Sequence, residues 1–190
     1  MFNIFGFYKF KKINNLKKLK KKLENNLKDY GISGTIIISS EGVNGTISAK
    51  NNNLFKFNKL LKKILSIKKY NSENNSNSKF NPFHKPKVKI KKEVVPMGFK
   101  VKNYKYPKNN LNPIEWNKII KKKDTVLIDA RKSFEYDVGT FKKSLNPNIE
   151  NFREFPKYLN QFKNNEKIAM FCTGGIRCEK ANIYLKKKRI

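Results

Sequence analysis

The chain is poor in the residues that build disulfide frameworks and zinc sites. Its 190 residues include only two cysteines, Cys172 and Cys178, and a single histidine, His84. Two cysteines are too few for a disulfide-stapled secreted scaffold, and a closed zinc site needs four ligands. We therefore expect no structural disulfide and no metal, and we expect the protein to reside in a reducing compartment, the cytoplasm.

Long apolar runs and acidic residues are scarce as well. No run approaches the roughly 20 apolar residues that a membrane-spanning helix needs, and the N-terminus lacks the pattern of a secretory signal. We therefore expect a soluble protein without a membrane partner. Only 14 Asp and Glu residues stand against 44 Lys and Arg residues, so the formal net charge is +30.

This positive charge favours a polyanionic partner, and RNA is the first candidate. Almost all of the charge comes from lysine, because arginine occurs only at Arg131, Arg153, Arg177 and Arg189. Enrichment in Lys, Asn and Ile also arises from nucleotide bias in a gene. Because net charge governs non-specific association rather than the choice of partner, both explanations stay open.

The first half of the chain carries alternating strand and helix patterns. Strand patterns occupy residues 2–10, 34–40, 46–49 and 88–95, and helical patterns occupy residues 13–30 and 54–67. Residues 41–45 are predicted to form a turn, and the polar residues 71–79 are predicted to form a surface loop. The order strand-helix-strand-strand-helix-strand predicts a ferredoxin-like, acylphosphatase-like α+β domain over residues 1–98.

A second domain is predicted over residues 111–190, after a linker at residues 99–110 that shows no periodicity. Its first helix has Asn112 as its N-cap candidate and Pro113 at the first helical position.

Two short apolar runs in this domain, residues 125–128 and 167–171, are typical of buried parallel strands. Ligands of open α/β sheets bind at the carboxyl ends of such strands, where Asp129 and Cys172 fall. We therefore expect an α/β domain with its site at this sheet edge.

Residues 172–178 read Cys-Thr-Gly-Gly-Ile-Arg-Cys and lie between an apolar run and a helical pattern. Gly174 and Gly175 permit a tight loop whose backbone N–H groups converge on the sulfur of Cys172, at the positive end of the next helix. A helix N-terminus and a nearby guanidinium, here that of Arg177, lower the pKa of a thiol from about 8.5. Cys172 is therefore predicted to be a catalytic thiolate, and the alternative is a small buried cysteine.

The other members of this loop are less specific. Thr173 and Ile176 complete the loop around Cys172. Cys178 is either a second, resolving thiol or an inert helix residue that packs against the sheet.

Four further polar residues, Asp129, Arg131, Glu41 and Asn44, are candidates for substrate binding or loop support, and for three of them a second interpretation stays open. Arg131 orients the loop or contacts phosphate, or it forms a structural ion pair with Asp129 or Glu135. Glu41 and Asn44 bind substrate, or they only shape the predicted turn at residues 41–45.

At the level of whole segments, the chain resembles a known family. Residues 172–180 resemble the active loop of rhodanese domains, and Asp129, Ala130 and Arg131 resemble a strand end of those domains. Residues 40–48, 91–95, 146–148 and 152–156 are similar to the tRNA uridine hydroxylase family. The resemblance covers nearly the whole chain.

The resemblance implies an oxidoreductase that converts the wobble uridine of tRNA, position 34, to 5-hydroxyuridine, with Cys172 as the essential cysteine. It implies tRNA as the partner, rather than DNA, and molecular oxygen as a co-substrate. The sequence contains no flavin, haem or non-haem iron signature, so it identifies no cofactor.

The chain departs from the rhodanese pattern at its end, because rhodanese modules add a strand and a helix after the active-site helix. The second domain is therefore predicted to be truncated after that helix. Two other functions stay open, namely a rhodanese-type sulfurtransferase that uses a Cys172 persulfide, and an inactive RNA-binding fragment.

Overall fold

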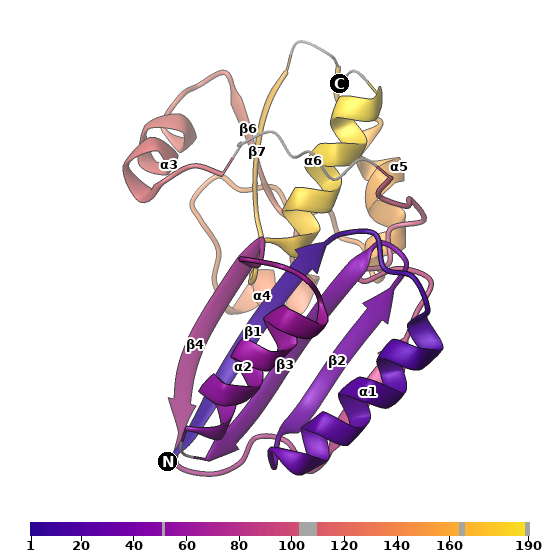
Figure 1. Cartoon of the computed structure of the whole chain (residues 1–190). Helices are drawn as coiled ribbons and strands as arrows, with labels where there is room; N and C mark the ends of the chain where they lie inside the picture. Colours follow the sequence, from indigo (N-terminus) through magenta and orange to yellow (C-terminus); the bar gives the residue numbers. More distant parts are fainter. Residues whose placement is uncertain (51, 103–109, 164–165, 189–190) are drawn as a thin grey trace. The chain divides into compact units, whose positions relative to one another are not determined.

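The computed structural model describes the whole chain except residues 51, 103–109, 164–165 and 189–190. The chain divides into two compact units, Met1–Val94 and Val95–Ile190, which are drawn in Figure 1. Most of the linker predicted at residues 99–110 lies outside the described residues. Each unit is considered by itself below.

The first unit is a five-stranded sheet with two helices on one face (Figure 1). The elements are β1 (Phe2–Phe10), α1 (Leu16–Asp29), β2 (Ser33–Ser39), β3 (Gly42–Lys50), α2 (Asn53–Ile64), β4 (Ser72–Ser78) and β5 (Pro86–Ile90). The strand order is β4-β1-β3-β2-β5, in which β5 is parallel to β2 and the other pairs are antiparallel. This arrangement confirms the predicted fold class.

The core of this unit forms where the apolar stripes of the helices meet the sheet. Leu23 and Leu27 of α1 are fully buried, whereas most lysines of the helix stay at least partly exposed. Phe57 and Leu61 of α2 are fully buried as well. Burying a side chain of this size stabilises the fold by about 1.5–3 kcal/mol, so these apolar positions dominate the placement of both helices.

The prediction of a surface loop at residues 71–79 is wrong, because β4 lies there. It pairs antiparallel with β1 from Phe2 opposite Ser78 to Tyr8 opposite Ser72. As an edge strand it is mostly exposed, so its side chains need no apolar alternation. Asn and Ser have low strand propensity, and the strand is held by its backbone pairing with β1.

The strand predicted at residues 88–95 is shorter and lies at the other edge of the sheet. β5 ends at Ile90 and pairs with β2, so it is an addition to the ferredoxin-like order rather than its fourth strand. The turn between β2 and β3 is also shorter than predicted. Only Ser40 and Glu41 form it, and Asn44 lies inside β3.

The second unit is built around two parallel strands. Its elements are α3 (Pro113–Ile120), β6 (Thr125–Asp129), α4 (Ser133–Val138), η1 (Phe152–Glu154), α5 (Phe155–Leu159), β7 (Lys167–Phe171) and α6 (Ile176–Lys188). β6 and β7 pair in parallel, and Leu145 adds a single bridge to Ile128. The predicted cap of α3 is confirmed, since Asn112 Oδ1 accepts the Glu115 N–H at 2.9 Å.

Residues that precede the predicted second domain also belong to this unit's core. Met97 is 1% exposed and packs with Ile128 and Phe155, and Phe99 packs against the same cluster. Lys180 of α6 is fully buried, and its ammonium donates to the Val95 carbonyl at 2.9 Å. The start of this unit is therefore fastened to the helix that follows the cysteine.

Candidate active site

The parallel pairing of β6 and β7 brings the predicted site residues together. Asp129 lies opposite Phe171 in the register, and the Ala130 N–H donates to the Phe171 carbonyl at 2.9 Å. Cys172 therefore leaves β7 beside the point where Arg131 leaves β6.

The sulfur of Cys172 accepts hydrogen bonds from the loop that follows it. The Gly175 N–H donates to Sγ at 3.1 Å, and the N–H groups of Arg177 and Cys178 donate to it as well. Gly175 has a φ of 86°, a left-handed conformation that turns its N–H toward the sulfur. The cysteine loop, residues 172–178, thus forms the predicted ring of donors at the N-terminus of α6.

These contacts keep the sulfur of Cys172 ionised near neutral pH. The largest cause is a hydrogen bond from the Cys178 thiol; burial opposes it, and the three backbone N–H groups add to it. Together they lower the pKa of Cys172 from 9.0 to about 6. Cys178 shifts the other way, because its bond to Cys172 and its burial raise the pKa of Cys178 well above 9.0.

The charge of Arg177 is placed differently from the prediction. Its guanidinium lies 3.5 Å from Glu135 Oε2 and donates to the Ala130 carbonyl at 3.4 Å. Its hydrogen bond to Cys172 comes from the backbone N–H. Its positive charge also acts on the neighbouring thiol, where it lowers the pKa of Cys178 against the larger opposing effects.

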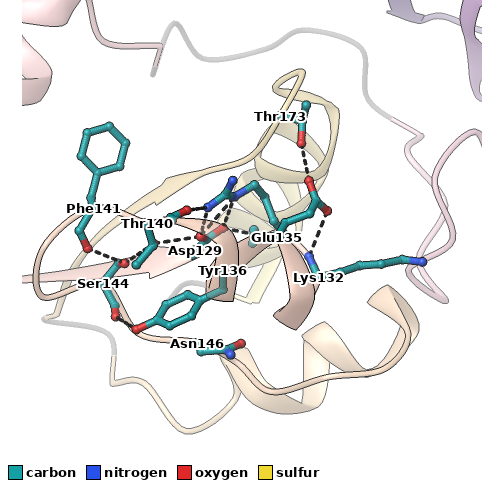
Figure 2. A network of polar contacts seen from close by, with 12 residues as sticks. Asp129, Lys132, Glu135, Tyr136, Thr140, Phe141, Ser144, Asn146 and Thr173 are labelled. Carbon is teal, nitrogen blue, oxygen red and sulfur yellow. Dashed lines mark hydrogen bonds and ion pairs between the residues drawn. The ribbon is translucent and has the colours of Figure 1, made fainter.

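A buried carboxylate anchors the neighbouring strand end (Figure 2). Asp129 is 1% exposed and accepts Nε of Arg131 at 2.9 Å and its Nη2 at 2.7 Å. The Thr140 hydroxyl donates to the same carboxylate at 2.9 Å. Burial works against ionisation, but the bonds from Arg131 and Thr140 outweigh it and hold the pKa of Asp129 below its ordinary value. The ion pair considered for Arg131 is therefore present.

Glu135 connects α4 to the cysteine loop (Figure 2). Its Oε1 accepts the Thr173 hydroxyl at 2.9 Å, and its Oε2 accepts the Lys132 N–H at 3.2 Å and faces Arg177. Burial opposes ionisation here too, and the Thr173 and Lys132 bonds prevail, so the pKa of Glu135 is lowered. The sequence suggested Glu135 only as a partner of Arg131, and nothing in its pattern indicated Thr140.

Glu41 and Asn44 lie in the first unit and contact the backbone of one residue. The buried carboxylate of Glu41 accepts the Val94 N–H at 3.0 Å, and Asn44 Nδ2 donates to the Val94 carbonyl at 3.4 Å. These contacts hold the end of the first unit. A role in substrate binding stays a prediction for both residues.

Among the described residues, no three His, Cys, Asp or Glu side chains gather as ligands of a metal ion would. His84 is exposed in the segment before β5. In the residues that the structure describes, no helix is long and apolar enough to cross a bilayer.

Alkylation of Cys172 should follow a titration with a midpoint near pH 6, because the thiolate is the reactive form. Below that pH the sulfur is protonated and the rate should fall. The measurement is the iodoacetamide rate at Cys172 against pH, followed by peptide mass spectrometry. Cys178→Ala should move the midpoint upward, since it removes the largest stabilising contact; a midpoint near 8.5 in the unaltered chain would contradict the geometry.

The two glycines of the loop should differ in their tolerance of alanine. Gly175→Ala should cost about 1 kcal/mol of stability and raise the pKa of Cys172, because a side chain disfavours φ of 86° and the N–H donor shifts. Gly174→Ala is the matched control, since nothing lies within 4 Å of its added Cβ. Urea unfolding and the alkylation titration compare the two variants; equal effects would refute the assigned role of Gly175.

Two family profiles match the two halves of the chain. The UPF0176 acylphosphatase like domain matches residues 2–94, and the Rhodanese-like domain matches residues 112–189. The fold and the cysteine loop thus define a protein in which an acylphosphatase-like domain precedes a rhodanese-like domain.

The chain belongs to the tRNA uridine(34) hydroxylase family. The protein of that name from Pelagibacter ubique (strain HTCC1062) is 60% identical over 188 residues, 99% of this chain and 62% of the relative. The one from Legionella pneumophila (strain Lens) is 40% identical, over 97% of this chain and 74% of the relative. The one from Prochlorococcus marinus (strain MIT 9515) is 41% identical, over 98% and 62%. The chain therefore spans about three fifths to three quarters of these relatives.

Proposed function

We propose that this chain hydroxylates the wobble uridine of tRNA, position 34, to 5-hydroxyuridine, in an oxygen-dependent reaction for which Cys172 is the essential group. The proposal makes it an oxidoreductase that acts in the cytoplasm, where tRNA is found. The observation that carries it is the identity to proteins named tRNA uridine(34) hydroxylase across nearly the whole chain. Molecular oxygen is the co-substrate in this proposal.

The chemistry of the loop supports a reaction at sulfur. A thiolate held by backbone N–H groups is both nucleophilic and oxidisable at neutral pH. Thr173 and Gly174 are exposed, so the loop is open to solvent beside Cys172, a half-buried residue. Arg131 and Glu135 act as positioning residues, because they fasten β6 and α4 beside this loop.

Expression of the chain in cells that lack their own hydroxylase tests the proposal. Nucleosides from the isolated tRNA are measured by mass spectrometry, with and without oxygen. The expected result is 5-hydroxyuridine that appears only in aerobic cells carrying the chain. If tRNA binds the purified chain but no 5-hydroxyuridine forms, RNA binding without modification is the better description.

The first unit supplies a surface for the tRNA backbone. A hollow of about 280 Å³ lies between the start of α1 and the end of α2, and its rim carries Lys12, Lys18 and Lys22, all exposed. Lys11 also lines this basic hollow, but its ammonium donates to the Leu65 carbonyl at 2.6 Å. In this proposal the three rim lysines contact phosphates of the tRNA.

Charge reversal at the rim should weaken tRNA binding. The Lys18→Glu, Lys22→Glu double variant is expected to bind tRNA roughly tenfold more weakly. The slope of log affinity against log salt concentration should fall in magnitude by about 1 for each lost phosphate contact. The matched control is Lys17→Glu, Lys21→Glu, which changes the net charge equally on the same helix but outside the hollow. Filter binding at several salt concentrations compares them; equal losses would mean that only net charge matters.

A second candidate function is sulfur transfer, which the match of residues 112–189 to the Rhodanese-like domain favours. The ring of N–H donors that holds the Cys172 thiolate also suits a persulfide on Cys172. An assay of thiosulfate and cyanide turnover by the purified chain distinguishes sulfur transfer from hydroxylation. Thiocyanate formation without 5-hydroxyuridine would favour this candidate over hydroxylation.

A further inference from the structure

The cysteine loop holds a second sulfur in direct contact with the first. Cys178 is the third residue of α6, and its backbone N–H donates to the sulfur of Cys172. The Cys178 thiol donates a hydrogen bond to the sulfur of Cys172. Both cysteines are free thiols, and both pack against the same apolar cluster of the second unit.

The contact couples the chemistry of the two sulfurs. While Cys172 is a thiolate, its negative charge and its acceptance of the thiol proton raise the pKa of Cys178, so Cys178 stays protonated. Oxidation of Cys172 to a neutral sulfenic acid removes that charge. Arg177, whose charge lowers the pKa of Cys178, then acts with less opposition. Cys178 therefore becomes a better nucleophile only after Cys172 has been oxidised.

We propose that Cys172 and Cys178 form a reversible redox pair, in which Cys178 resolves a sulfenic acid on Cys172 as an intramolecular disulfide. This inference goes beyond the proposed hydroxylation, because it assigns the second thiol a reaction that needs no tRNA. The oxidant is a peroxide, and the reductant that restores the pair is a dithiol.

The reaction is balanced in two steps. The Cys172 thiolate attacks a peroxide oxygen, the O–O bond breaks, and the sulfur loses two electrons to give Cys172–S–OH and a hydroxide or alkoxide. This leaving group takes from the solvent the proton that Cys172 had released and becomes water or an alcohol. The Cys178 sulfur then attacks the Cys172 sulfur, an S–S bond forms, the S–O bond breaks, and the oxygen leaves as water with the Cys178 proton. Two thiols and one peroxide thus give one disulfide, one alcohol or water, and one water.

The loop permits the approach that the bond requires. A disulfide has an S–S distance of about 2.0 Å, so the two sulfurs, which a hydrogen bond already joins, must approach each other further to form it. Gly174 is exposed, with nothing within 4 Å of a Cβ at that position, so it leaves room for that movement. The bond consumes the thiolate, so the oxidised pair is inactive and is protected from irreversible oxidation to sulfinic acid.

Mild hydrogen peroxide treatment of the reduced full chain tests the redox pair. Remaining thiols are blocked with iodoacetamide, and the digested peptides are analysed by mass spectrometry. The expected product in the unaltered chain is a crosslink between Cys172 and Cys178 that dithiothreitol reverses. In Cys178→Ala, Cys172 should instead gain two oxygens, and this sulfinic acid should accumulate several-fold faster than in the unaltered chain.

Cys172→Ala is the matched control, in which no crosslink within one chain can form because Cys178 has no partner sulfur. The result on the unaltered chain decides the question even if a variant folds poorly. Sulfinic acid at Cys172 without a crosslink, or crosslinks only between two chains, would overturn the redox pair. Because the assay contains no tRNA, neither outcome depends on whether the chain hydroxylates uridine.

Discussion

Replacing Cys172 by serine is expected to abolish formation of 5-hydroxyuridine, with a loss on the order of 1,000-fold or more. A hydroxyl at this position stays protonated at neutral pH, whereas the sulfur is held as a thiolate by Gly175, Arg177 and Cys178. The measurement is 5-hydroxyuridine in tRNA from cells that depend on the variant.

Binding and folding separate this effect from a general loss of structure. The Cys172→Ser chain should bind tRNA with the affinity of the unaltered chain, because the rim lysines of the basic hollow belong to the first unit. Its far-UV circular dichroism should also be unchanged. Unaltered levels of 5-hydroxyuridine in the Cys172→Ser strain would mean that the reaction does not need the sulfur, and they would contradict the proposed mechanism.

Replacing Asp129 by asparagine is expected to destabilise the second unit by about 3 kcal/mol, since it leaves a guanidinium without its buried counter-charge. The carboxylate is fully buried, and it accepts bonds from both Arg131 and Thr140. Trp116 is the single tryptophan of the chain, and its ring lies 5.7 Å from Phe141 and 6.1 Å from Phe171. Its fluorescence during urea unfolding therefore reports on this unit.

A matched control lies just before the same strand. Asp124 pairs with Lys167, and both side chains are more than half exposed. Asp124→Asn should therefore leave the midpoint of urea unfolding nearly unchanged. The pH dependence adds a second readout. Because the pKa of Asp129 is lower in the folded chain, its stabilisation is present at neutral pH and is lost as the pH falls below about 4. The difference in unfolding free energy between the unaltered chain and Asp129→Asn should become smaller at that low pH. A difference that does not change with pH would argue against the ion pair.

Much of the second unit was predictable because its signals are local. An apolar run ending at Asp129 and another ending at Cys172 predict two parallel strands, and the structure pairs them in that manner. Gly174 and Gly175 predict a tight loop, and Gly175 has the positive φ that such a loop needs. Asn112 and Pro113 predict the start of α3 because caps depend on only a few neighbouring residues.

The errors in the first unit have a common physical reason. β4 consists of Ser, Asn and Glu, and it is a strand because β1 offers it an unpaired edge, not because its own side chains favour one. The segment at residues 88–95 has a better strand composition than β4. Only its first three residues belong to a strand, as the end of β5, which pairs with β2 as an extra strand. Pairing partners distant in sequence decide such cases, and residue patterns do not contain them.

By itself, the sequence determined the two-domain order, the helices with apolar stripes, the strand ends at Asp129 and Cys172, and the membership in a family of tRNA-modifying enzymes. Each of these depends on neighbouring residues or on segments that can be compared directly. Only the tertiary structure decided that Arg177 acts on Cys172 through its N–H group while its charge faces Glu135, and that the Cys178 thiol is the largest cause of the low pKa of Cys172. The direction of an N–H group or a thiol depends on how the loop turns in space, and hydrogen bonds act only over about 3 Å.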